Sequence, residues 1–400
     1  MYKLYCRLYQ YVFKGASLLL PWREPQLLEG KNSLNKLPHI IKNQGIECLL
    51  IVTDRMIASL GLMDGFLKGL SEEGVAYIIY KETVPNPTID NIEEALQLYH
   101  SNHCQGIVAF GGGSSMDCAK GVGARAARPD KIIPEMKGLF KVRRKIPPLF
   151  AIPTTSGTGS ETTIAAVITD SRTHEKYAIN DMALIPQTAV LDPLLTINLP
   201  PHITSTTGMD ALTHAVEAYI GKSNTKRTKH YSREAVSLIF ENLFQAYTDG
   251  QNIAARENMQ RASYLAGLAF TRAYVGNVHA IAHTLGGFYS TPHGLANAVV
   301  LPYVLEYYGK NVYKPLAELA DLVNLNIRQE DSNKTKAAVF IETIKTLNKN
   351  MGIPSKVDCI VEKDIPLMVG RALAESNPLY PVPKIMTKED MTKIYYLIKE

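Results

Sequence analysis

Near the middle of this chain the pattern of apolar residues changes, and this change sets the strongest limit on the fold. In the first half, short runs rich in β-branched residues alternate with patterns typical of helices. We expect strands, each running into a loop, within residues 48–54, 75–88, 106–115 and 147–161, and helices at 91–101 and 116–126. Strands that alternate with helices predict βαβ units and a parallel sheet. Ligands bind such sheets beyond the carboxyl ends of the strands.

From about residue 204 onward the strand signals vanish. Apolar spacing predicts helices at 234–247, 254–270, 312–323 and 334–349. A length of 400 residues exceeds the usual size of one hydrophobic core. We therefore expect two domains, an α/β domain over 1–200 and an all-helical domain over 201–400, joined in the proline-marked segment 198–204.

The composition narrows the classes of protein to consider. With 46% hydrophobic and 20% charged residues, it is typical of a soluble globular protein. The net charge of +5 is thinly spread, so we expect no nucleic-acid or membrane partner. Five scattered cysteines without a CxxC pair fit a reducing cytoplasm. Near the N-terminus Lys14 interrupts the apolar run, so we interpret this segment as a first structural element and not as a signal peptide.

Residues 110–120, FGGGSSMDCAK, join a predicted strand to a predicted helix through three glycines. Bare backbone amides at the N-terminus of a helix favour an anion such as phosphate. A flexible strand-to-helix turn fits the same residues, and the GxGxxG fingerprint of dinucleotide binding is absent from the chain.

Two other strand ends carry groups that suit a nucleotide. Residues 153–161, PTTSGTGSE, offer five hydroxyls that could bond ribose or phosphate, although a polar surface loop has the same composition. Asp54 could accept hydrogen bonds from ribose hydroxyls and repel a 2′-phosphate, which would favour NAD over NADP. An exposed loop aspartate is the alternative interpretation of Asp54.

The histidines form a further group. Asp210 and His214 are four residues apart and would share one face of a helix, as in many amphipathic helices. A second such pair, His279 and His283, is followed by His293. One carboxylate and three imidazoles are a plausible ligand set for Zn²⁺ or Fe²⁺.

Taken together, these segments resemble the iron-containing (group III) alcohol dehydrogenases. The family's order is kept by VTD, VPNPT, GGGSSMDCAK, PTTSGTGSE, GMDALTHAVEAY and VHAIAHTLGGFYSTPHGLANAVVLP, from near Leu27 to the C-terminal helices. The resemblance implies a dinucleotide-binding α/β domain and an all-helical metal-binding and substrate domain, with the active site in the cleft between them. The implied activity is reversible hydride transfer between a primary or secondary alcohol, or its aldehyde or ketone, and NAD or NADP.

The resemblance also implies roles for single residues. A metal ion, Fe²⁺ or alternatively Zn²⁺, would be held by Asp210, His214, His279 and His293, with His283 as a catalytic or substrate-positioning neighbour. NAD, or alternatively NADP, would contact Asp54, Asn86, Gly112, Gly113, Ser114, Asp117, Thr154, Thr155, Thr158, Thr163 and Lys176. We also expect a homodimer or larger homo-oligomer.

Three other functions share this fold. Polyol dehydrogenases of the glycerol type use a three-ligand zinc site, and a related branch uses NAD and a metal for a lyase reaction, as in 3-dehydroquinate synthase. A catalytically idle scaffold is the third. The complete four-residue set, Asp210, His214, His279 and His293, favours the iron-type dehydrogenase over all three.

Overall fold

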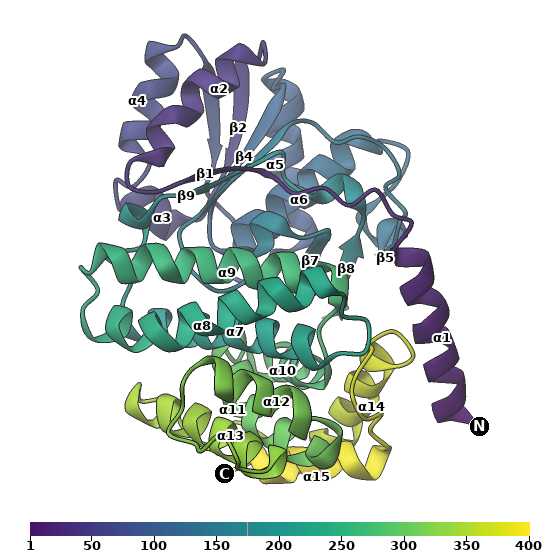
Figure 1. The fold of residues 1–400 in the computed structure, drawn as a ribbon. Helices are drawn as coiled ribbons and strands as arrows, with labels where there is room; N and C mark the ends of the chain where they lie inside the picture. The colour runs from purple at the N-terminus through teal and green to yellow at the C-terminus, as the bar shows by residue number, and fades with distance from the viewer. Residues whose placement is uncertain (174) are drawn as a thin grey trace. The chain divides into compact units, whose positions relative to one another are not determined.

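The computed structural model describes residues 1–173 and 175–400, which form two compact units. One unit is Pro21–Asn198, and the other combines Met1–Leu20 with Leu199–Glu400. The first contains every strand of the described chain, and the second is helical (Figure 1). The predicted fold class, a parallel-sheet α/β domain followed by an all-helical domain, is confirmed.

The main sheet of the α/β unit has six strands in the order β1-β9-β6-β4-β2-β3. All neighbouring pairs in this sheet are parallel. The strands are β1 (Gln26–Glu29), β2 (Cys48–Val52), β3 (Ala76–Tyr80), β4 (Gly106–Gly111), β6 (Leu149–Pro153) and β9 (Thr188–Leu191). The four predicted strand segments hold β2, β3, β4 and β6, each followed by the predicted loop. The sequence analysis missed β1 and β9, which are four residues long and show no readable period.

Helices cover both faces of this sheet because successive side chains of a strand point to opposite sides. In β2, Leu49 and Ile51 lie in the hydrophobic core with α2 and α4, whereas Leu50 and Val52 lie in the core with α5 and α6. The helices of this unit are α2 (Leu37–Asn43), α3 (Arg55–Ser59), α4 (Asp64–Glu72), α5 (Ile89–Ser101) and α6 (Gly113–Ala127).

A second, small sheet takes one strand from before β6 and two from after the loop that follows β6. It consists of β5 (Gly138–Leu139), β7 (Ala165–Asp170) and β8 (Glu175–Asn180), with β7 and β8 antiparallel. The backbone N–H of Thr169 donates to the carbonyl of Pro87 at 2.9 Å, which ties this sheet to the loop after β3. Two of the loops predicted to contact the dinucleotide are therefore anchored to one element that the sequence analysis did not predict.

The helical unit has ten α-helices in the described chain. They are α1 (Tyr2–Ser17), α7 (Pro201–Ile220), α8 (Lys226–Thr248), α9 (Ile253–Ala273), α10 (Asn277–Tyr289), α11 (His293–Tyr308), α12 (Tyr313–Leu322), α13 (Asn333–Asn350), α14 (Ile365–Ser376) and α15 (Lys388–Ile398). The predicted helices 234–247, 254–270, 312–323 and 334–349 correspond to α8, α9, α12 and α13. No helix is long and apolar enough to cross a membrane among the residues described.

The first helix does not belong to the α/β domain in which the sequence analysis placed residues 1–200. In α1, Cys6 and Gln10 are buried against the helical unit. The amide of Gln10 donates to the carbonyls of Pro378 at 3.0 Å and Tyr380 at 2.7 Å. Polar contacts to residues more than 360 positions away fix this helix, and the local pattern of α1 carries no sign of them.

Candidate functional site

Two residues of the candidate metal centre lie on α7, and most of this helix is buried. Every residue from 208 to 220 is buried, including Asp210, His214 and Glu217. Ionisable groups rarely lie fully buried unless they are paired or bind a metal. Asp210 and His214 are one turn apart, as predicted, and Glu217 lies one turn further along the same face.

The other two members of the predicted set come from α10 and α11. His279 lies in the first turn of α10, and His293 is the first residue of α11. The glycine after His293 is required here, because a Cβ at Gly294 would lie 2.3 Å from the carbonyl oxygen of Thr206 on α7. This close approach lets the start of α11 sit directly on α7.

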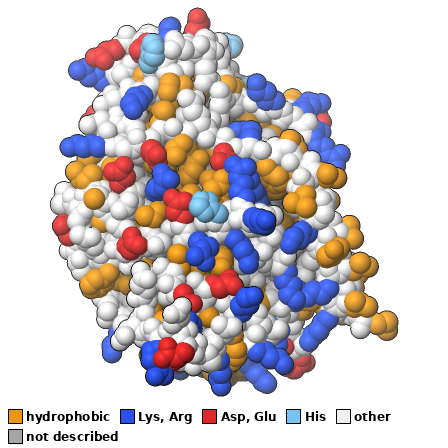
Figure 2. Space-filling view, viewed as in Figure 1, with side chains coloured by type: hydrophobic (Ala, Val, Ile, Leu, Met, Phe, Trp, Pro, Cys, Tyr) orange, Lys and Arg blue, Asp and Glu red, His pale blue; other side chains and the backbone are white. Residues whose placement is uncertain are grey.

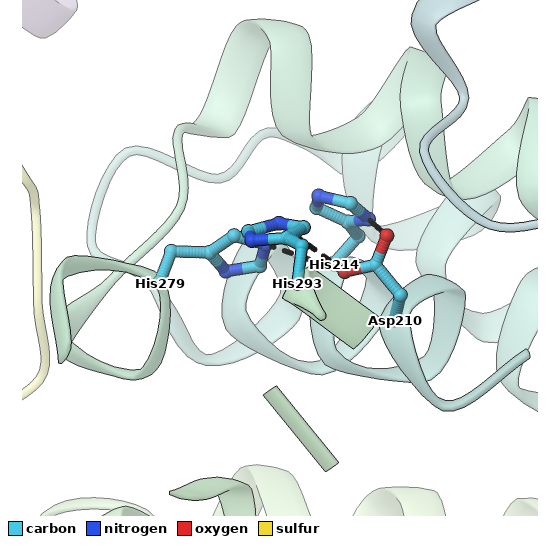
Figure 3. A group of neighbouring side chains, drawn as sticks. All are labelled: Asp210, His214, His279 and His293. Carbon is cyan, nitrogen blue, oxygen red and sulfur yellow. Dashed lines mark ion pairs between the residues drawn. The ribbon is translucent and has the colours of Figure 1, made fainter. Parts of the chain in front are cut away.

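The four predicted ligands meet at one point (Figure 3). Asp210 Oδ1 lies 3.5 Å from His293 Nε2 and 3.9 Å from His279 Nε2, and Asp210 Oδ2 lies 4.0 Å from His214 Nδ1. One ligand atom from each of the four residues lies within 4.8 Å of all the others. The structure thus brings together the residues that the resemblance assigned to the metal.

The donor set fits a divalent transition metal. Bonds of about 2.1 Å to nitrogen and oxygen place the farthest ligands of one ion about 4.2 Å apart, close to the spacing seen here. Asn297 Nδ2 lies 2.7 Å from Asp210 Oδ1, 3.1 Å from His293 Nε2 and 3.2 Å from His279 Nε2. Three ligand atoms therefore surround one polar position, at which Asn297 Nδ2 lies. Zinc and ferrous iron both accept three imidazoles and a carboxylate.

Burial and neighbouring charge keep His279 in the form that binds a metal. Loss of hydration lowers the pKa of His279 well below its usual value, and the nearby His214, His293 and His283 lower it further. Neutral imidazole is the ligating species. Its ring stacks on that of His214, with the centroids 4.4 Å apart.

A buried glutamate orients His279. Glu217 Oε2 accepts from His279 Nδ1 at 2.7 Å and from the N–H of Gly276 at 2.7 Å, and its Oε1 accepts from the N–H of Val278 at 2.8 Å. Burial raises the pKa of Glu217 to about 8, and hydrogen bonds from the backbone N–H groups of Val278, Gly276 and His279 oppose that rise by stabilising the carboxylate. A proton held on Nδ1 leaves Nε2 for the metal. The sequence analysis missed Glu217, although its spacing from Asp210 and His214 on one helix could have revealed it.

His283 lies beside this cluster and has a different partner. Its Nδ1 is 2.6 Å from Glu375 Oε1 on α14, and the same oxygen accepts from the Tyr380 hydroxyl at 2.8 Å. The ring of His283 stacks on that of His293 with the centroids 5.2 Å apart. The side chains of His283 and His293 are 23% and 30% exposed, whereas those of His214 and His279 are at most 5% exposed. The two partly exposed histidines therefore mark the side from which a small molecule can reach the cluster.

The second candidate region is the glycine loop at the carboxyl end of β4. Gly112 is the residue before α6, and the helix start carries no side-chain cap. Its first N–H groups are thus available to an anion such as pyrophosphate. A Cβ at Gly113 would lie 2.7 Å from Thr158 Cγ2, so glycine is needed for the loops after β4 and β6 to pack. Thr155 lies 3.5 Å from the Cβ position of Gly112.

The loop after β6 is held by one buried lysine. Lys120 Nζ donates to the carbonyls of Ser160, Thr163 and Ala165 at 2.7–2.9 Å and to the hydroxyls of Ser160 and Thr163 at 3.1 and 2.8 Å. Burial lowers the pKa of Lys120 to about 8, and the neighbouring carboxylates of Asp117 and Glu161 oppose that shift. Lys120 belongs to the motif FGGGSSMDCAK, but no role was predicted for it.

The remaining predicted cofactor residues lie around this loop. Asn86 Oδ1 accepts from Lys176 Nζ at 2.8 Å, and the N–H of Asn86 donates to Ser114 Oγ at 3.2 Å. Asp54 caps α3 by accepting from the N–H of Ile57 at 2.9 Å, and its Oδ2 lies 3.8 Å from the Cβ position of Gly111. Residues from four separate strand ends therefore meet, as the parallel sheet predicts.

Thr154, Thr163 and Asp117 are tied into the protein itself. Thr154 is buried, and its N–H donates to the carbonyl of Gly111 at 3.1 Å. Asp117 Oδ1 accepts from Ser160 Oγ at 3.2 Å, and the hydroxyl of Thr163 bonds to Lys120. These contacts shape the loops. Whether these three residues also touch the dinucleotide stays a prediction.

Comparison with known proteins gives a consistent result across the chain. Residues 25–193 match the family model described as iron-containing alcohol dehydrogenase, and residues 204–398 match the model of the C-terminal part of the same family. A 1,3-propanediol dehydrogenase from Citrobacter freundii is 37% identical over 92% of this chain and 95% of its own length. An NAD-dependent methanol dehydrogenase from Bacillus methanolicus is 35% identical over 92% and 97%. A crystal structure of a 1,3-propanediol oxidoreductase superimposes with a TM-score of 0.91 at 36% identity, covering 94% of this chain and 99% of its own.

Proposed function

We propose, on the premise that this chain belongs to the iron-containing alcohol dehydrogenase family, that it transfers hydride reversibly between a small alcohol and NAD at a divalent metal centre on α7, α10 and α11. The observation that carries this proposal is the convergence of Asp210, His214, His279 and His293 within 4.8 Å. The chain is an NAD-dependent alcohol oxidoreductase, and its metal ligands, catalytic base and substrate are the proposed details.

The metal ligands would be Asp210 and the three histidines of the cluster, with Glu217 as the residue that orients His279. When bound, the metal ion supplies a Lewis acid that acidifies the alcohol hydroxyl, and the dinucleotide supplies the hydride acceptor. Iron and zinc both suit the donor set, so the metal present in the cell depends on availability.

His283 is the proposed proton carrier for the alcohol. An ionised carboxylate can only accept hydrogen bonds, so Glu375 fixes the ring with its proton on Nδ1. Nε2 is then free to take a proton from the alcohol or to return one to the aldehyde. The partial exposure of His283 leaves a route for that proton to solvent.

NAD would bind the α/β unit with its pyrophosphate at the N-terminus of α6. Support comes from the uncapped helix start and from the close packing of Gly113 against Thr158. Asp54 at the end of β2 would bond the ribose hydroxyls and disfavour the 2′-phosphate of NADP. We therefore propose NAD as the preferred cofactor, with NADP as the weaker one.

For the substrate we propose short primary alcohols and terminal diols, with their aldehydes in the reverse direction. The names of two relatives, a 1,3-propanediol dehydrogenase and a methanol dehydrogenase, support this class.

The five cysteines are free, which agrees with the proposed reducing cytoplasm. The homo-oligomeric state remains part of the proposal.

The proposed function is tested on metal-free protein reconstituted with Fe²⁺ or Zn²⁺. Formation of NADH from methanol, ethanol, 1-propanol, 1,3-propanediol and glycerol would be followed with NAD and with NADP. We expect turnover only with metal, with NAD preferred. Preference for glycerol would indicate the polyol-type enzyme, and turnover of none of these alcohols with either metal would contradict the proposal.

A further inference from the structure

The outer face of α1 is unusually apolar for a protein surface. Among the described residues, nine of the eighteen large hydrophobic side chains classed as exposed lie within the first nineteen positions. Figure 2 shows apolar side chains along the edge of the molecule where Figure 1 places α1. Contiguous exposed apolar surface of this kind marks a binding surface. The family match begins at residue 25, so this surface lies outside the region that carries the proposed function.

The amphipathic character of α1 is inverted relative to an ordinary surface helix. The side facing the protein buries Cys6 but is otherwise held largely by hydrogen bonds from polar side chains. Arg7 Nη1 donates to the carbonyl of Val382 at 2.7 Å, and Lys14 Nζ donates to the carbonyl of Lys222 at 2.9 Å. Gln10, on the same side, is buried. The apolar side therefore faces away from the unit that holds the helix.

The outward face has the pattern of a helix that lies in a lipid interface. Leu4, Leu8 and Val12 recur every fourth residue and form one ridge, with exposed fractions of 74%, 63% and 63%. Tyr5 and Tyr11 flank the ridge on its two sides, with exposed fractions of 55% and 79%. Tyrosine is favoured at the boundary between lipid and water because its ring is apolar and its hydroxyl is polar.

Charge indicates the partner. Helix α1 contains Lys3, Arg7 and Lys14 and no aspartate or glutamate, and the neutral carbonyls that Arg7 and Lys14 contact leave their charge in place. A two-fold contact between the α1 helices of two copies would bring like charges together. An anionic surface is attracted instead, and basic amphipathic helices bind such surfaces by combining apolar burial with attraction to charged headgroups.

We propose that α1 binds the surface of a bilayer containing anionic phospholipids, with Leu4, Leu8 and Val12 inserted among the acyl chains near the headgroups. The helix has 16 residues and no described helix qualifies as a membrane span, so it would lie in the interface and not cross it. This proposal departs from the sequence-based expectation of no membrane partner. That expectation rested on the thinly spread net charge of the whole chain.

The test is flotation of the full-length protein with vesicles. One set would be phosphatidylcholine alone, and the other would contain about one-third phosphatidylglycerol. We expect the protein to float with the anionic vesicles, less with the neutral ones, and less as salt is raised. Leu4→Ser/Leu8→Ser should lower the partition coefficient by about a hundredfold, because each buried leucine contributes roughly one factor of ten.

Leu397→Ser is the matched control. Leu397 is 51% exposed on α15, so its loss should leave flotation unchanged. Alcohol oxidation by the double variant should equal that of the wild type, which separates this proposal from the proposed function. Absence of flotation with anionic vesicles would overturn the proposal. So would a wild-type oligomer, measured by sedimentation, that falls apart in Leu4→Ser/Leu8→Ser, because a second copy would then be the partner.

Discussion

The two candidate sites differ in the parts of the chain that form them: backbone in one and side chains in the other. The proposed dinucleotide region consists of backbone at the ends of strands. Its glycines allow the loops to pack closely, and Lys120 donates hydrogen bonds to the loop after β6. The metal cluster consists of side chains from α7, α10 and α11, with Glu217 holding one of them. Added volume should therefore damage the first site, whereas removal of a single side chain should damage the second. Each of the first four changes below is expected to affect one site and spare the other.

The largest effect is expected from removing a proposed metal ligand. His279→Ala should lose both metal and activity while binding NAD as the wild type does, because His279 belongs to the helical unit. Metal content and NAD affinity would be measured on the same preparation. His230→Ala is the control, since this histidine of the same unit is 73% exposed. Full metal content in His279→Ala would remove His279 from the ligand set.

Removing the neighbouring histidine should separate chemistry from metal binding. His283→Ala is expected to keep its metal and to lose about 10²–10⁴ in kcat, the usual contribution of a general acid–base group. The measurement pairs kcat with metal content. A metal-free variant would make His283 a ligand, and a metal-loaded variant with full activity would reduce it to a packing residue.

Disturbing the residue behind the ligand should have a smaller effect. In Glu217→Gln one oxygen and one NH₂ group replace the two oxygens that accept from three N–H donors. We expect metal affinity to fall by about 10–100-fold, as for other groups that orient a metal-binding histidine. Competition with a chelator measures this affinity. Glu241→Gln, at an exposed position on α8, should match the wild type, and wild-type metal affinity in Glu217→Gln would contradict the orienting role.

The dinucleotide region should respond to a single added methyl group. Gly113→Ala would place Cβ 2.7 Å from Thr158 Cγ2, so the two loops must move apart. We expect NAD affinity to fall about tenfold, the effect of roughly 1.4 kcal/mol of overpacking, with metal content unchanged. Gly65→Ala is the control, because nothing lies within 4 Å of a Cβ there. NAD affinity equal to that of the wild type would show that this packing does not shape the site.

The smallest expected effect is on stability and depends on pH. Burial raises the pKa of Glu161 from 4.5 to about 7. The folded state therefore binds more protons than the unfolded state between these values, and the stability of the α/β unit falls as pH rises through this window. Melting temperature measured across the window should decline less in Glu161→Gln. Glu72→Gln, whose side chain is 66% exposed, should keep the wild-type slope, and a Glu161→Gln slope equal to the wild type's would contradict the argument.

How much of each site could be predicted follows from the same contrast. The glycine loop and the hydroxyl-rich loop are local stretches at strand ends, so alternation of strands and helices was enough to place Asp54 and Gly112 near each other. Strands β1 and β9 were missed because strands of four residues show little period. The small sheet with β7 and β8 was missed as well. That small sheet anchors the loop that carries Asn86. The elements that hold the site in place were therefore harder to predict than the residues of the site itself.

The metal cluster was predicted through family resemblance and not from spacing alone. Helical spacing paired Asp210 with His214 and His279 with His283. It could not show that His293 lies close to Asp210, His214 and His279, or that His283 lies outside this group. That outcome depends on Gly294, which lets α11 approach Thr206, and on Glu375, which lies 92 residues from His283 and pairs with it. Contacts at such separation have no local signal.

The central claim is that Asp210, His214, His279 and His293 hold one metal ion. The most direct test is anomalous diffraction from crystals of the protein loaded with Zn²⁺. We expect one strong peak about 2.0–2.2 Å from an oxygen of Asp210 and from one nitrogen of each of the three histidines, with His283 outside bonding distance. A peak bonded to His283, or a main peak away from these four residues, would contradict it.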